Sequence, residues 1–129
     1  MTLRSVLKNK SLGILVHPSS LPGGSYCGTF GKGAKDWIKK LSKHKINFWQ
    51  FLPLTPTDST GSPYSSPSSF ALNPWFLDIN ELFERGFISL SNRQELQSIN
   101  QKEDYFNFDF ANSLCKTLAE HLLNSWESQ

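Results

Sequence analysis

The fold of this chain is decided by residues 12–53, LGILVHPSSLPGGSYCGTFGKGAKDWIKKLSKHKINFWQFLP. The stretch opens with a short apolar run, residues 12–17, that stops at Pro18, and such a run predicts a strand buried on both faces. It closes with an aromatic and β-branched run, residues 46–52, that stops at Pro53 because proline lacks the N–H that a strand ladder needs. We therefore expect two strands.

A loop and a helix separate these two runs. Residues 18–33 are rich in proline and glycine, which predicts an irregular loop. A helix is predicted over Gly33–Lys45, because its apolar residues share one helical face: Ala34, Trp37, Ile38 and Leu41. Strand, helix and strand form a βαβ unit, so we expect an α/β fold with a parallel sheet. Ligands of such folds bind at the carboxyl ends of the strands, which places the loops after His17 and Leu52 on the functional face.

A loop is predicted over residues 53–74. Its residues 55–69 are rich in Ser, Thr and Pro, but the aromatic residues Tyr64 and Phe70 argue for an ordered segment rather than a linker. The remaining part, residues 75–127, is predicted to be mainly helical. A short helix over residues 80–85 has Gly86 at its C-terminal cap, and Ser91 is predicted to cap a helix over residues 92–99. The last helix carries an apolar stripe of Ala111, Leu114, Cys115, Leu118, Leu122 and Trp126.

Composition excludes several classes of protein. The 129 residues are 38% hydrophobic and 13% aromatic, enough for a packed core, and the net charge of +2 gives no bulk attraction to anionic partners. Cys27 and Cys115 are too few and too far apart for a disulfide framework, which favours a reducing, cytoplasmic location. Residues 1–10 show no targeting segment, and the apolar run behind them is too short to cross a membrane. We expect no membrane partner, although a plastid location stays open.

Three further kinds of site fit the sequence poorly. The glycines near Lys32 lack the spacing of a phosphate or dinucleotide loop. The lysines of the predicted helix could contact nucleic acid, but Trp37 shares the apolar face and is better explained as core, so no nucleic-acid partner is expected. The histidines and cysteines show no metal-ligand spacing, and we expect neither a metal nor an organic cofactor.

Tyr64 is the strongest candidate for ligand binding. A tyrosine ring can lie against the C–H face of a sugar while its hydroxyl bonds a ring substituent, and Pro63 would hold it stiffly. His17 ends the first predicted strand and could form part of the same rim, or it could simply bond the local backbone. Four acidic residues lie in turns or near helix ends: Asp58, Asp78, Glu81 and Glu84. None of them forms a recognisable pair of carboxylates of the kind that glycoside chemistry needs.

Four blocks of sequence resemble the N-terminal part of the amylomaltase, or disproportionating enzyme, family of 4-α-glucanotransferases (glycoside hydrolase family 77). They are His17-Pro18-Ser19-Ser20-Leu21-Pro22-Gly23, Phe48-Trp49-Gln50-Phe51-Leu52-Pro53-Leu54, Ser62-Pro63-Tyr64-Ser65 and Asn73-Pro74. The resemblance implies a (β/α)8 barrel that transfers a segment of α-1,4-glucan to the 4-hydroxyl of an acceptor, with retention through a covalent intermediate. It implies binding of α-1,4-glucans and maltooligosaccharides, with Ser62, Tyr64 and Asn73 as substrate-binding residues.

The same resemblance implies that the catalytic carboxylates come from later barrel strands, in motifs that this sequence does not contain. A closed barrel takes roughly 250 residues, and two predicted strands do not close one. We therefore expect residues 1–129 to form the N-terminal part of an incomplete barrel: a βαβ unit at 12–53, a glucan-site loop at 53–74 and a helical insertion at 75–127. This chain alone is expected to be inactive. The sequence departs from the family pattern at Gly61, directly before Ser62-Pro63-Tyr64, where many family members have an acidic residue. The alternative is a non-catalytic carbohydrate-binding module.

Overall fold

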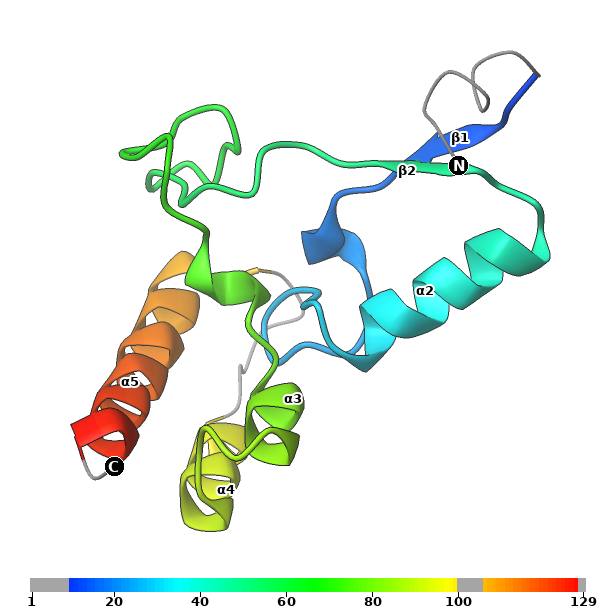
Figure 1. Cartoon of the computed structure of the whole chain (residues 1–129). Helices are drawn as coiled ribbons and strands as arrows, with labels where there is room; N and C mark the ends of the chain where they lie inside the picture. The colour runs from blue at the N-terminus through cyan, green and yellow to red at the C-terminus, as the bar shows by residue number, and fades with distance from the viewer. Residues whose placement is uncertain (1–9, 100–105, 128–129) are drawn as a thin grey trace.

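The computed structural model describes residues 10–99 and 106–127. Residues 1–9, on which most of the targeting prediction rests, lie outside the described part. The elements follow one another as β1 (Gly13–Leu15), the 3-10 turn η1 (Pro18–Ser20), α2 (Lys32–Lys43), β2 (Phe48–Gln50), the 3-10 turn η2 (Pro74–Phe76), α3 (Ile79–Glu84), α4 (Leu90–Ser98) and α5 (Phe108–Glu127). Figure 1 shows the two strands with α2 at one end of the molecule and α3, α4 and α5 gathered at the other.

The two strands form a parallel pair in which Ile14 lies opposite Trp49, and α2 connects them along the chain. The predicted βαβ order is therefore present. The prediction that the first strand is buried on both faces is wrong, because Leu12 is 61% exposed and Leu15 is 55% exposed. Within the described residues the sheet has only two strands, so no further layer covers these side chains.

Helix α2 begins one residue before the predicted start and ends two residues before the predicted end. Its last turn is closed by Lys45, whose φ of 57° turns the chain toward β2. Ala34 and Leu41 are buried, but Ile38 is 54% exposed, so the apolar face is narrower than predicted. Trp37 is half-buried.

The glycine-rich loop before α2 is built for close packing. A Cβ on Gly28 would lie 2.1 Å from the carbonyl oxygen of Pro18, and one on Gly31 would overlap the carboxylate of Asp78. Both contacts are far shorter than any real Cβ contact, so a side chain at either position would force the backbone apart. The glycines thus allow segments distant in the sequence to touch.

Residues 51–73 form the long irregular loop between β2 and η2 in Figure 1. The backbone N–H of Asn73 donates to the carbonyl oxygen of Leu54 at 2.8 Å and closes the loop at its base. Within the loop, Asp58 accepts from the backbone N–H of Thr60 at 2.9 Å, the Asx-turn expected of an aspartate in this setting. The loop is ordered by its own hydrogen bonds rather than by regular secondary structure.

The caps of the short helices explain where they begin and end. Asp78 caps α3 by accepting from the backbone N–H groups of Asn80 and Glu81. At the other end Gly86 has a φ of 77°, and its N–H and that of Phe87 bond carbonyls of the last turn, as in a Schellman motif. The predicted cap of the next helix is wrong: Ser89, not Ser91, accepts from Asn92 N–H and begins α4 at Leu90.

The hydrophobic core lies between α3, α4 and α5, not against the sheet. Its buried members are Ile79, Ile88, Leu96, Leu114 and Leu118. Most of the predicted stripe of α5 faces this core, but Trp126 is 80% exposed, so the stripe ends about one turn early. No helix among the described residues is long and apolar enough to span a membrane.

Candidate functional site

His17 follows β1 and is held by the turn that begins directly after it. Its Nδ1 lies 2.8 Å from the hydroxyl of Ser19 and accepts from the backbone N–H of Ser19 at 3.4 Å. The ring meets Phe76 edge-on, with centroids 5.4 Å apart. The local backbone contact foreseen for this histidine is therefore present, and the opposite nitrogen faces away from the turn.

The Ser-Pro-Tyr segment lies in the long loop after β2. The Ser62 hydroxyl accepts from the backbone N–H of Tyr64 at 3.3 Å, while the Tyr64 side chain is 74% exposed. Pro63 precedes the tyrosine and fixes the backbone there. The ring is consequently displayed to solvent on a turn that its own neighbours stabilise.

Asn73 is only 5% exposed and caps η2, because its Oδ1 accepts from the backbone N–H of Trp75 at 3.0 Å. The amide nitrogen of Asn73 carries two N–H donors. This side chain therefore positions the turn with its oxygen and can offer its nitrogen to a ligand.

Three of the five predicted site residues meet in one cavity of about 180 Å³, here called the strand-end cavity. His17, Pro63 and Asn73 line it, together with Leu52 and Pro53, which lie two and three residues after the end of β2. Ser62 and Tyr64 do not line it; the loop carries them next to its wall. The cavity thus lies at the carboxyl ends of both strands, where ligands of parallel α/β folds bind.

Residues that the sequence reasoning missed complete the wall of this cavity: Ser19, Thr55, Thr57, Gly61, Trp75 and Phe76. Trp75 and Phe76 directly follow the Asn73-Pro74 block, so their position could have been noticed. Thr55 and Thr57 join the site only because the loop folds back on itself. Sequence spacing carries no signal for that.

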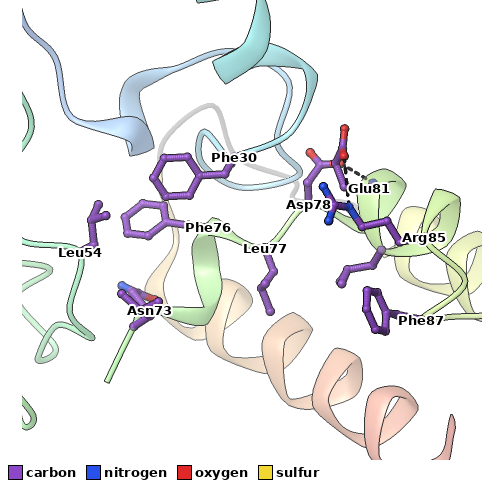
Figure 2. Close-up of a pocket in the computed structure, with 11 residues that line it drawn as sticks. Phe30, Leu54, Asn73, Phe76, Leu77, Asp78, Glu81, Arg85 and Phe87 are labelled. Atoms are coloured by element: carbon purple, nitrogen blue, oxygen red, sulfur yellow. Dashed lines mark hydrogen bonds and ion pairs between the residues drawn. The ribbon is translucent and has the colours of Figure 1, made fainter. Parts of the chain in front are cut away.

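A second cavity is larger, about 340 Å³, and mainly apolar. Figure 2 shows Phe30 beside Phe76 on one side of it, and Arg85 and Phe87 on the other. Its charged groups are already engaged: Glu81 pairs with Arg85 at 3.8 Å and with Lys35, and Asp78 caps α3. Sugar recognition needs available polar groups, so we assign the candidate site to the smaller strand-end cavity.

The carboxylates lie apart from the strand-end cavity. None of the described residues that line it is Asp, Glu, Lys or Arg. The nearest in sequence, Asp58, accepts hydrogen bonds from the Thr60 hydroxyl and backbone N–H, and these bonds lower the pKa of its carboxyl group. Retaining glycoside chemistry needs two carboxyl groups about 5–5.5 Å apart across the sugar. This cavity can hold a neutral polar ligand but does not contain such a pair.

A cluster of a tyrosine and two thiols lies behind the site. The Tyr26 hydroxyl donates to the carbonyl oxygen of Trp75 at 3.0 Å and lies 3.4 Å from Sγ of Cys115. Burial raises the pKa of Tyr26, raises the pKa of Cys27 to about 12 and raises the pKa of Cys115. Both cysteines are free thiols. The cluster ties the glycine-rich loop to α5 and keeps its groups protonated.

The described residues contain no group of three or more His, Cys, Asp or Glu side chains arranged to hold a metal ion. The lysines of α2 are partly neutralised on the surface. Lys32 and Lys39 both pair with Asp36, and Lys35 reaches Glu81.

Comparison with known proteins places the geometry in context. The sequence profile of 4-alpha-glucanotransferases matches residues 16–128. This chain belongs to the 4-alpha-glucanotransferase family. The match includes every residue that lines the strand-end cavity. It assigns the chain to this family rather than to a family of stand-alone carbohydrate-binding modules.

Comparisons with individual relatives support the same family. The chain is 43% identical to the 4-alpha-glucanotransferase of Thermus thermophilus over 81 residues, which are 63% of this chain and 16% of that protein. It is 38% identical to the enzyme of Streptococcus pneumoniae over 105 residues, 81% of this chain and 20% of that protein. Among solved structures, the amylomaltase from Streptococcus agalactiae in complex with acarbose has a TM-score of 0.82 and 31% identity, over 94% of this chain and 24% of that one. The chain thus spans about a fifth of its relatives' length.

Proposed function

We propose that this chain forms part of the glucan-binding site of a 4-α-glucanotransferase. The complete activity would transfer a segment of α-1,4-glucan to the 4-hydroxyl of an acceptor by a retaining double displacement. The observation that carries the proposal is the family match over residues 16–128, which spans the whole strand-end cavity. The relative from Streptococcus agalactiae was solved with acarbose, which supports a maltooligosaccharide-like ligand.

In this proposal the βαβ segment is the first unit of a (β/α)8 barrel. The exposed sheet residues Leu12 and Leu15 support this, because barrel strands are normally covered by neighbouring strands and helices. The free thiols of Cys27 and Cys115 suit a reducing compartment, so the cytoplasm is the proposed location.

The proposed role is to bind sugar rather than to cleave it. The cavity offers aromatic and proline surfaces together with hydroxyl, imidazole and amide groups, a combination suited to a neutral sugar. At about 180 Å³ it is smaller than the roughly 300–1,000 Å³ of ligand pockets in general, so we assign it a single sugar ring. Ser62 and Tyr64, beside the cavity, would contact the adjoining unit of the glucan.

Calorimetry with maltotriose tests the proposal. We expect the chain to bind maltotriose, because an α-1,4-linked glucan is the proposed ligand. It should not bind cellobiose, the β-linked isomer of maltose. Chromatography of the same mixture should show unchanged maltotriose. Binding of neither sugar, or of both equally, would refute the proposed glucan site, and glucose with longer maltodextrins would refute the assignment of binding without chemistry.

A further inference from the structure

We propose that His17 binds the sugar by donating a hydrogen bond from its Nε2–H to a hydroxyl oxygen of the ring in the strand-end cavity. This inference rests on the proposed function and names the atom that holds the ligand. It starts from the turn that follows β1, because that turn decides which ring nitrogen carries the proton.

The tautomer of His17 follows from its role as the cap of η1. Nδ1 accepts from the backbone N–H of Ser19, and a backbone N–H can only donate. A lone pair on Nδ1 satisfies both this long 3.4 Å contact and the 2.8 Å contact with the Ser19 hydroxyl, so we place the ring proton on Nε2. The Ser19 hydroxyl, 2.8 Å from the same Nδ1, donates to it as well.

The Nε2–H group is free to donate a hydrogen bond to a ligand. Its nearest protein acceptor is the carbonyl oxygen of Pro53 at 3.5 Å, longer than the about 2.7–3.2 Å of an ordinary N–H···O bond. The edge-on contact with Phe76 holds the ring against swinging away. An oxygen atom in the cavity could therefore take this proton without breaking a good bond.

A second described residue that lines the cavity also has a polar atom without a partner. This residue is Thr57, whose Oγ1 is buried without a hydrogen-bond partner among the described residues. Buried hydroxyls in native proteins are nearly always bonded. The Asn73 amide nitrogen, on the same cavity, adds further donors. A sugar hydroxyl both donates and accepts, so it matches this set, whereas a carboxylate or an ammonium ion would find no opposite charge.

Two variants of His17 separate its two tasks. His17→Asn keeps a side-chain oxygen able to cap η1, since asparagine is among the best N-cap residues, but it cannot reach the position of Nε2. His17→Gln places an amide nitrogen near the position of Nε2 but caps the turn less well. The affinity for the sugar should therefore be retained in His17→Gln, and the stability of the turn should be retained in His17→Asn.

The experiment is ¹⁵N NMR of the histidine side chains of the full chain, with maltotriose as the probe. In the free chain we expect the Nε2–H tautomer at His17, and the same tautomer in Ser19→Ala, because that variant keeps the backbone N–H that bonds Nδ1. Maltotriose should shift Nε2 of His17 and leave His44, an exposed histidine at the end of α2, unchanged. His17→Asn should bind maltotriose about five-fold more weakly, the loss expected for one hydrogen bond, while His17→Gln should retain most of the affinity.

The outcomes distinguish the two proposals. An Nδ1–H tautomer in the free chain, or undiminished binding by a folded His17→Asn, would overturn the role of His17 even if the chain binds glucan. Shifts at Tyr64 and Asn73 without any at His17 would do the same. If maltotriose shifts no resonance of the cavity or of residues 53–74, the glucan site itself fails, and the inference falls with it.

Discussion

The Thr29 hydroxyl donates a 2.6 Å hydrogen bond to Oδ2 of Asp78, joining the loop before α2 to the first residue before α3. Thr29 is only 6% exposed, and the other oxygen of Asp78 caps α3. One carboxylate therefore links the βαβ segment to the helical half of the chain, as do the bonds of Tyr26 to Trp75 and of Lys35 to Glu81. These links bear on the strand-end cavity, since His17 comes from the first part and Phe76 from the second.

Replacing Asp78 should loosen this connection. Asp78→Ala removes both the cap and the partner of a buried hydroxyl, and we expect it to lower the free energy of unfolding by about 2 kcal/mol. Asp78→Asn keeps one acceptor oxygen and should cost less. Urea unfolding followed by circular dichroism measures the difference, with the exposed Glu84→Gln on the same helix as the control. Equal stability of Asp78→Ala and the unaltered chain would contradict the structural role.

Gly31 should tolerate no side chain while Asp78 is present. A Cβ at this position would overlap the Asp78 carboxylate, so Gly31→Ala should be destabilised by about 1–3 kcal/mol. In the double variant with Asp78→Ala the cost should be smaller, because the overlapping oxygens are gone. A double-mutant cycle of urea unfolding gives the coupling, and strictly additive costs would show that the overlap is not the cause.

The two thiols should react slowly in the folded chain. The thiolate is the reactive form, and burial raises the pKa of Cys27 to about 12 and raises the pKa of Cys115. At about pH 8 we expect iodoacetamide to modify Cys27 at least about 100-fold more slowly than in urea, with the rate rising as pH approaches the raised pKa. Fast labelling of both thiols in the folded chain would contradict this burial.

The same shift has a consequence for stability. Because the folded pKa lies above that of the unfolded chain, the unfolded thiol ionises first as the pH rises. The contribution of Cys27 is fully present below about pH 9 and should be lost between about pH 9 and 12. Cys27→Ala should flatten this part of the stability profile, and an unchanged profile would assign the loss to other groups.

Tyr64 should contribute to glucan binding through its ring more than through its hydroxyl. The side chain is 74% exposed and stands beside the cavity, so we expect Tyr64→Ala to weaken maltotriose binding about ten-fold and Tyr64→Phe only slightly. Phe70→Ala, which removes an even more exposed aromatic ring (98%) from the same loop, is the control. Unchanged calorimetric affinity of Tyr64→Ala would leave the tyrosine a purely structural residue.

Apolar runs bounded by prolines were enough to predict the βαβ order and the loops on its functional side. They could not predict burial, because the exposure of Leu12 and Leu15 depends on whether further strands are present. The cap of α4 was misplaced by two residues, since Ser89 and Ser91 have the same propensity and only the buried Ile88 just before Ser89 fixes where the chain turns.

The candidate site, too, could be predicted from the sequence only in part. His17 was predicted because it ends the first predicted strand, and Asn73 because it matches the family's Asn-Pro block; both line the cavity. The loop closure between Asn73 and Leu54, which brings Thr57 to the same wall, is a tertiary contact with no local signature. Whether Ser62 and Tyr64 contact glucan stays a prediction.

The central claim is that the strand-end cavity and its loop bind α-1,4-glucan. Backbone ¹H–¹⁵N NMR during a titration with maltotriose tests it most directly. We expect chemical-shift changes at four residues and their neighbours: His17, Thr57, Tyr64 and Asn73. The resonances of the α2 lysines should not shift. Movement confined to α2 or to the larger apolar cavity, or no movement at saturating maltotriose, would contradict the claim.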